Sequence, residues 1–318
     1  MSVVLVTPDN YETIRKTIKH LQAQTVREKL EIVIVAPSVE KLGLVESEMK
    51  DFLQFRVVEV GQIKIMAQVK AIAVREAQAP FVVFGEDHSY PDPHWAEALI
   101  TAHQQGHAAV GPAMENANPN TMLSWASMFL SFGPYFEPAS ARVTDQLPWH
   151  NISYKRQLLM DYGDKMASMI VIEGVLLDEL RAKGHEIYLE PAAKTHHLNI
   201  SLLSSLIKHA FWGGRLYAAV RAREERWSLW RRLLYIGGMP LIPFVRLRRT
   251  VKEIYRTDRQ QELMPRMLPA LISGLVPHAI GELTGYAFGL GNAEERYSHY
   301  EMLRINHVTA QDRKAEGY

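Results

Sequence analysis

The first ninety residues alternate between short apolar runs and segments with helical period, and this pattern constrains the fold more than any other feature. Four runs rich in apolar residues, at 3–6, 31–36, 55–60 and 81–84, have the length of strands. Between the first two runs, apolar residues recur every three or four positions. Strands that alternate with helices of about 10–15 residues predict βαβ units. We therefore predict an α/β protein with a Rossmann-like, mostly parallel sheet flanked by helices.

Composition limits the size of the core, the classes of partner and the cellular compartment. A chain of 318 residues can bury one large core, or a core with an accessory region. A net charge of +1 provides no global field for nucleic acid, so we expect no nucleic-acid partner. The lack of cysteine excludes disulfides and thiolate metal sites and fits a reducing compartment. The first apolar run spans only four residues and is typical of a strand, not of a signal peptide. These observations predict a cytoplasmic protein.

Three consecutive polar side chains, Glu86, Asp87 and His88, follow the fourth run after a single glycine, Gly85. The carboxyl ends of strands are where open α/β sheets bind ligands. A carboxylate and an imidazole there could bind a divalent cation and, through it, the phosphates of a nucleotide. The alternative is a polar loop that only ends a strand.

The character of the chain changes after about residue 201. Residues 200–255 have a helical pattern rich in tryptophan and arginine, and 267–290 are apolar. Two prolines, His278, Glu282 and four glycines interrupt the second run, which argues against a full membrane span. The composition favours helices lying on an anionic membrane surface, at the inner face of the membrane. A packed helical cap or a dimer interface would explain it equally. We predict that the tail, 291–318, is polar and frayed.

Three segments, taken in order, carry a resemblance to a known family. The first strand leads into Thr7-Pro8-Asp9, and the fourth leads into Glu86-Asp87-His88. The third segment is Asn151-Ile-Ser-Tyr-Lys-Arg156, followed by Glu173, Gly184 and His197. Together they resemble the large inverting, nucleotide-sugar-dependent glycosyltransferase family with the GT-A fold (family 2), in a subgroup where Glu-Asp-His replaces Asp-x-Asp. The resemblance covers roughly residues 2–200 and is loose over 201–290.

The resemblance implies an activity and a division of the chain. A GT-A domain would occupy 1–205, and a helical, membrane-associated accessory region would occupy 206–318. The activity would be hexosyltransferase-like, moving a sugar from a nucleoside-diphosphate sugar to a hydroxyl with inversion, in polysaccharide or glycolipid biosynthesis. Its partners would be that donor, a glycan or lipid-linked acceptor and a second copy in a homo-oligomer. Two other functions remain open, a degenerate non-catalytic GT-A scaffold and a nucleotidyltransferase.

The family pattern also implies roles at the site. Glu173, on a helix predicted over 164–183, would be the general base, although the family's second acid is missing here; the alternative is an exposed helix carboxylate. Glu86, His88 and His197 would bind a metal ion, Mn²⁺ in preference to Mg²⁺ because of the histidines. The adjacent pair His196-His197 could instead lie at the protein surface. The candidate donor-binding residues are Glu86, Asp87, Thr7, Asp9, Lys70, Arg75 and Asn151, of which Lys70 and Arg75 could simply be solvated.

Overall fold

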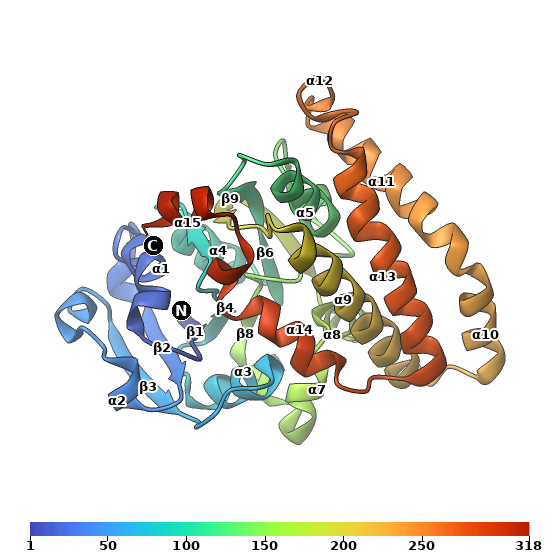
Figure 1. Ribbon diagram of the computed structural model, residues 1–318. Coiled ribbons are helices and arrows are strands. Elements are labelled where there is room, and N and C mark those ends of the chain that lie inside the picture. Colours follow the sequence, from blue (N-terminus) through green and yellow to red (C-terminus); the bar gives the residue numbers. More distant parts are fainter. Residues whose placement is uncertain (318) are drawn as a thin grey trace. The chain divides into compact units, whose positions relative to one another are not determined.

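The computed structural model describes residues 1–317, and the chain divides into two compact units (Figure 1). Unit 1 comprises Met1–Glu115 and Ala139–His197, and unit 2 comprises Asn116–Pro138 and Leu198–Tyr318. Tyr318 itself lies outside the described residues. The predicted domain boundary near residue 205 stays a prediction, because compact packing alone does not define a functional domain.

Unit 1 contains a mixed sheet. Within the described residues it has nine strands, in the order β3-β2-β1-β4-β8-β6-β9-β5, with β7 paired to β9. The first four strands in the chain run parallel, as predicted: β1 (Ser2–Val6), β2 (Glu31–Ala36), β3 (Gln54–Glu59) and β4 (Phe81–Phe84). Antiparallel pairs follow beyond β4, formed by β5 (Ser89–Pro91), β6 (Ala109–Asn116), β7 (Arg142–Val143), β8 (Ser153–Lys155) and β9 (Ile187–His197). The α/β class is confirmed, and parallel pairing is confined to one half of the sheet.

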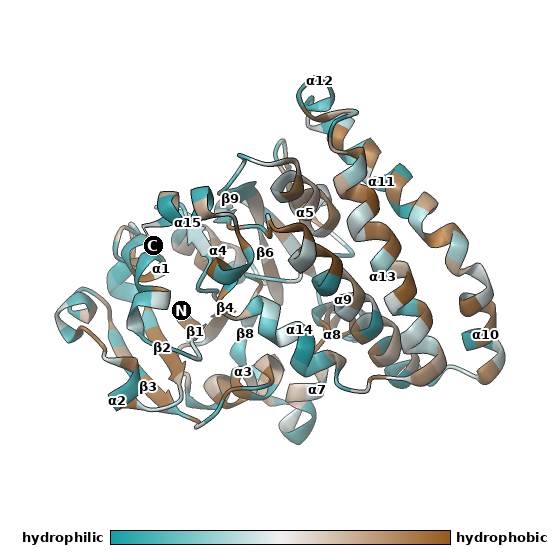
Figure 2. Ribbon diagram, in the orientation of Figure 1, coloured by the Kyte–Doolittle hydropathy of each residue, from teal (hydrophilic) through white to brown (hydrophobic). Residues whose placement is uncertain are grey.

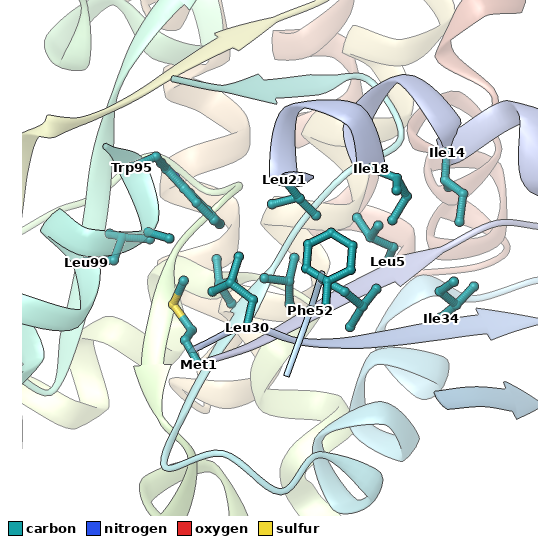
Figure 3. Close-up of a cluster of buried hydrophobic side chains, with 14 of the residues drawn as sticks. Met1, Leu5, Ile14, Ile18, Leu21, Leu30, Ile34, Phe52, Trp95 and Leu99 are labelled. Carbon is teal, nitrogen blue, oxygen red and sulfur yellow. The ribbon is translucent and has the colours of Figure 1, made fainter. Parts of the chain in front are cut away.

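Helices cover both faces of the parallel half. Alternate strand residues such as Leu5 pack with Ile14 and Ile18 of α1 (Tyr11–Gln22) in one buried cluster, shown in Figure 3. α4 (Trp95–Gln104) contributes Trp95 and Leu99 to the same cluster. α3 (Met66–Glu76) contacts β1 and β2 but adds no side chain to this cluster, so it covers the opposite face. Each buried leucine or isoleucine contributes about 1.5–3 kcal/mol relative to exposure.

The single helix predicted over 164–183 is wrong. The segment forms a short turn, α7 (Met166–Ile170) and α8 (Glu173–Ala182), separated by an extended Ile172 with φ −125° and ψ 97°. The break follows three β-branched residues, 170–172, whose side chains crowd the preceding turn of a helix. α8 ends, as expected, with Gly184 in the left-handed region at φ +85°. The remaining helices of unit 1 are α2 (Val39–Leu42) and α6 (Arg156–Met160).

Unit 2 is helical. Its elements are α5 (Met122–Phe132), η3 (Gly133–Tyr135), α9 (Leu203–Glu224), α10 (Leu229–Gly238), η5 (Met239–Leu241), α11 (Ile242–Arg256), α12 (Gln260–Leu263), α13 (Leu268–Phe288), α14 (Ala293–Glu301), η6 (Arg304–His307) and α15 (Ala310–Glu316). α9 and α13 lie side by side (Figure 1). A Cβ added at Gly281 of α13 would lie 2.1 Å from the Phe211 carbonyl oxygen of α9, and one at Gly214 would lie 2.1 Å from the His278 carbonyl oxygen. Two of the four glycines that interrupt the apolar run, Gly281 and Gly285, are therefore points where the backbones of α9 and α13 meet.

The prediction of a frayed tail is wrong for the described residues up to 317, because α14 and α15 are packed. Asp312 is buried, and its carboxylate accepts hydrogen bonds from Ser201, Thr309 and Asn120. A buried carboxylate with several donors holds its segment in place. Among residues 1–317, no helix has both the length and the apolarity that a membrane span requires.

Candidate functional site

Glu86 is the centre of a buried polar cluster two residues beyond the end of β4. Its Oε2 accepts hydrogen bonds from Ser89 Oγ at 2.7 Å and from Asn151 Nδ2 at 2.9 Å. Its Oε1 lies 2.9 Å from His150 Nδ1. Burial opposes ionisation of Glu86, but the surrounding imidazoles outweigh burial and hold its pKa well below the ordinary value. Glu86 is therefore an anion at neutral pH.

Three metal-ligand side chains converge at this point. The ligand atoms of Glu86, His88 and His197 lie within 4.8 Å of one another. His88 Nε2 is 3.8 Å from Glu86 Oε1, and His197 Nε2 is 3.7 Å from Glu86 Oε2. These are the three residues expected as metal ligands.

His88 shows that the cluster fits a cation. Its Nδ1 contacts the Asp87 carboxylate, whose oxygens accept from an N–H, so Nδ1 acts as the donor and Nε2 is the ring nitrogen directed at Glu86. This Nε2 is buried and makes no hydrogen bond within the described part of the chain. A carboxylate behind an imidazole is the usual arrangement around a metal-ligating histidine. Glu86 with the two imidazoles is a donor set that suits Mn²⁺.

Strand pairing places His197 in the cluster. β5 pairs antiparallel with β9, so that Ser89 lies opposite His197 and Tyr90 opposite His196. Successive residues of a strand point to opposite faces. His197 accordingly faces Glu86, whereas His196 Nε2 lies 2.9 Å from Asp92 Oδ1. The adjacent histidines thus have two different environments.

Glu173, the first residue of α8, provides a second buried carboxylate. Lys70 Nζ lies 3.8 Å from its Oε1, and the Tyr154 hydroxyl lies 3.5 Å from its Oε2. Burial raises the pKa of Glu173 to about 7, against the opposing effects of Lys70 and His150. Glu86 and His150 both act on this pKa, so Glu173 belongs to the same electrostatic cluster. A carboxyl with this pKa can accept a proton near neutral pH.

The other candidate donor-binding residues are more dispersed. Thr7 is buried in the turn after β1, where its hydroxyl accepts from the Asp9 amide and donates to a carbonyl, each at 3.3 Å. Asp9 is half-buried at the same end of the sheet. Arg75 is exposed and donates to the Gly163 carbonyl at 3.1 Å. The structure therefore joins Lys70 and Asn151 to the cluster and directs Arg75 to a neighbouring turn.

Sequence reasoning missed His150. Residues 149–154 have a strand-like pattern, but β8 begins only at Ser153. Asn151 instead has a left-handed backbone, with φ +60°, and the turn directs both His150 and the Asn151 amide at Glu86. The only signal in the sequence is a polar pair, His150-Asn151, between apolar neighbours.

Comparison with known proteins identifies a family. Residues 2–163, just over half of the chain, match the family model described as Glycosyl transferase family 2. None of the curated protein sequences matches the chain significantly.

Solved structures share the fold. The mannosyltransferase PcManGT from Pyrobaculum calidifontis, in complex with GDP-Man and Mn²⁺, has a TM-score of 0.53 and 14% identity over 90% of this chain and 86% of its own. TarS 1-349 from S. aureus in complex with UDP has a TM-score of 0.46 and 15% identity over 89% and 90%. GalNAc-T7 with UDP, GalNAc and Mn²⁺ has a TM-score of 0.45 and 12% identity over 62% and 43%. The chain thus spans less than half of that GalNAc-T7 chain and 55% of a longer TarS chain. The family match and the first of these structures confirm the predicted GT-A fold.

Proposed function

The chain belongs to glycosyl transferase family 2, and from this premise we propose that it transfers a hexose from a nucleoside-diphosphate sugar to an acceptor hydroxyl with inversion. The proposal depends on one observation: Glu86, His88 and His197 converge in a buried cluster that also includes a second carboxylate of raised pKa, Glu173. Inversion places the nucleophile and the leaving diphosphate on opposite faces of the sugar. The site must therefore stabilise the departing diphosphate and accept the proton of the acceptor.

The first requirement falls to the metal-ligand cluster. Glu86, His88 and His197 would hold Mn²⁺ or Mg²⁺, which when bound neutralises the negative charge that develops on the diphosphate. Asp87 orients His88, and the Asn151 amide fixes the Glu86 carboxylate. In this proposal Asp87 and Asn151 act by positioning metal ligands.

Glu173 meets the second requirement. As the acceptor oxygen attacks, its proton passes to a Glu173 carboxylate oxygen. The new glycosidic bond forms while the bond to the diphosphate oxygen breaks, and the electron pair stays on the diphosphate. A pKa of about 7 makes Glu173 a stronger base than an ordinary glutamate while leaving much of it ionised at neutral pH. Lys70, at 3.8 Å, favours the ionised form.

Donor recognition is assigned to the carboxyl end of β1. Thr7 and Asp9 lie there and would contact the nucleobase or ribose. Sugar derivatives of uridine and guanosine diphosphate are the first donors to test, and the mannosyltransferase structure that shares this fold contains GDP-Man. Arg75 would contribute only by moving away from the Gly163 carbonyl. We place the enzyme in the cytoplasm, acting on a glycan or lipid-linked acceptor.

Ligand-linked stability tests the metal site. A ligand at one hundred times its dissociation constant stabilises the folded state by about 2.7 kcal/mol. UDP or GDP should therefore raise the melting temperature with Mn²⁺ present and much less without it. His88→Ala should remove the metal-dependent part, whereas His196→Ala should keep it, because His196 faces Asp92. If no nucleotide stabilises the protein with Mn²⁺, the chain is a non-catalytic scaffold and the proposal fails.

The role of Glu173 needs a separate experiment. Glu173→Gln should abolish transfer and leave nucleotide binding nearly unchanged, because the amide keeps the shape but cannot accept the proton. Glu179→Gln, on the outer part of the same helix, is the matched control. Loss of nucleotide binding together with transfer in Glu173→Gln would remove Glu173 from the role of base.

A further inference from the structure

A continuous helical run in unit 2 exposes large apolar side chains along its length. The run consists of α10, η5 and α11. Trp230 is 82% exposed, Leu234 72% and Phe244 71%. Leu229, Leu241 and Val245 are also exposed. Exposed apolar residues of monomeric proteins are normally scattered, and a contiguous apolar patch marks a binding surface.

The opposite side of this run is anchored, so the apolar face is fixed outward. α10 and α11 both pack on α13. Tyr235 of α10 lies with its ring centroid 5.5 Å from that of Tyr286 of α13, beside Trp227. Figure 2 shows hydrophobic and hydrophilic residues alternating along α10 and α11, as expected for helices with two different faces.

The charge of the run identifies the kind of partner. Residues 229–252 contain five arginines and one lysine and no aspartate or glutamate, although the whole chain has a net charge of only +1. Phe244, Arg248 and Lys252 follow at intervals of four and share one face of α11. Arg248, Arg249 and Lys252 are exposed and form no ion pair within residues 1–317. The partner must therefore accept apolar side chains and present negative charge at the same surface.

We propose that this face, Leu229–Lys252, docks onto an anionic phospholipid bilayer. Leucine, tryptophan and phenylalanine would enter the boundary between headgroups and acyl chains, and the cations would pair with lipid phosphates. In this proposal the run lies in the plane of the surface, because its apolar side chains and cations are spread along its length. A second copy of the chain fits less well, because it would set two strongly basic faces against each other. This proposal does not depend on the transferase activity.

Vesicle co-sedimentation tests the proposal with the full chain. The protein should bind vesicles made of equal amounts of phosphatidylglycerol and phosphatidylcholine, and at least about tenfold more weakly vesicles of phosphatidylcholine alone. Each cation near an anionic surface contributes about a fivefold factor, so the triple change Arg248→Gln, Arg249→Gln, Lys252→Gln should weaken binding roughly a hundredfold. Leu234→Ser with Phe244→Ser should weaken it about tenfold or more.

A matched control separates this face from general surface properties. Leu53 of unit 1 is 63% exposed, and Leu53→Ser should leave vesicle binding unchanged. All variants alter exposed residues and should keep the wild-type melting temperature. The proposal is overturned if the wild-type protein does not bind the anionic vesicles. It is also overturned if the wild type and both variants bind them equally. A dimer that Leu234→Ser with Phe244→Ser converts to a monomer, with no vesicle binding, would assign the face to a second copy instead.

Discussion

Glu173→Gln should stabilise the folded protein at high pH, and this can be measured before any substrate is known. The folded state holds the pKa of Glu173 near 7, whereas an unfolded glutamate has the model value of 4.5. Between these values the folded state binds more protons than the unfolded state, so the free energy of unfolding falls as pH rises. The contribution of Glu173 is fully present below about pH 4.5 and lost as pH passes 7. Glutamine has no such titration.

The magnitude follows from the two pKa values. A difference of about 2.5 pKa units corresponds to about 3 kcal/mol, at about 1.4 kcal/mol per unit. Glu173 is almost fully buried, so solvent does not screen this effect. Relative to the wild type, the free energy of unfolding of Glu173→Gln should therefore rise by about 3 kcal/mol between pH 4.5 and pH 8. A carboxylate that destabilises the fold in this way is typical of an active site.

Urea denaturation of both proteins across this pH range provides the assay. Taking the difference between variants cancels the titration of all other groups. Lys70→Gln offers an internal check: it removes the cation that favours ionised Glu173, so the gain from Glu173→Gln should extend to higher pH. A difference between wild type and Glu173→Gln that is constant across pH would refute the burial argument and, with it, the reason for assigning Glu173 as the base.

Three further predictions concern packing and hydrogen bonding, each checked by denaturant unfolding. Gly281→Ala should lower the free energy of unfolding by about 2 kcal/mol, because the new Cβ would meet a carbonyl oxygen of α9 at 2.1 Å. This overpacking outweighs the better helix propensity of alanine. Gly237→Ala, in open space on α10, should instead stabilise by up to about 1 kcal/mol, and equal effects at both positions would contradict the packing. Asn151→Ala should lower the free energy of unfolding by at least about 1.5–3 kcal/mol, because it removes a donor to ionised Glu86 and places alanine at a left-handed backbone position. An unchanged stability would contradict both effects. Asp312→Ala should lower stability by a similar amount, about 2 kcal/mol, unless the tail is not held by its hydrogen bonds.

Local pattern determined the parallel half of the sheet and the place of the polar triplet Glu86-Asp87-His88 after β4. Strands β1 to β4 are short segments rich in apolar or β-branched residues, which can be recognised without a distant partner, and helices of amphipathic period separate them. Because Glu86 and His88 lie within four residues of the end of β4, their position at the end of the sheet was also a local property. Two of the three segments that carry the family resemblance lie at the ends of β1 and β4.

Tertiary structure alone decided which other side chains reach Glu86. The pairing of β5 with β9 selects His197 over His196, and a one-residue change of register would exchange them. A left-handed backbone at Asn151 brings in His150, which no periodicity predicted. The break at Ile172 makes Glu173 the first residue of a helix. Contacts between segments far apart in the chain create these arrangements. The periodicity of apolar residues cannot predict them, because it depends only on residues that are close in sequence.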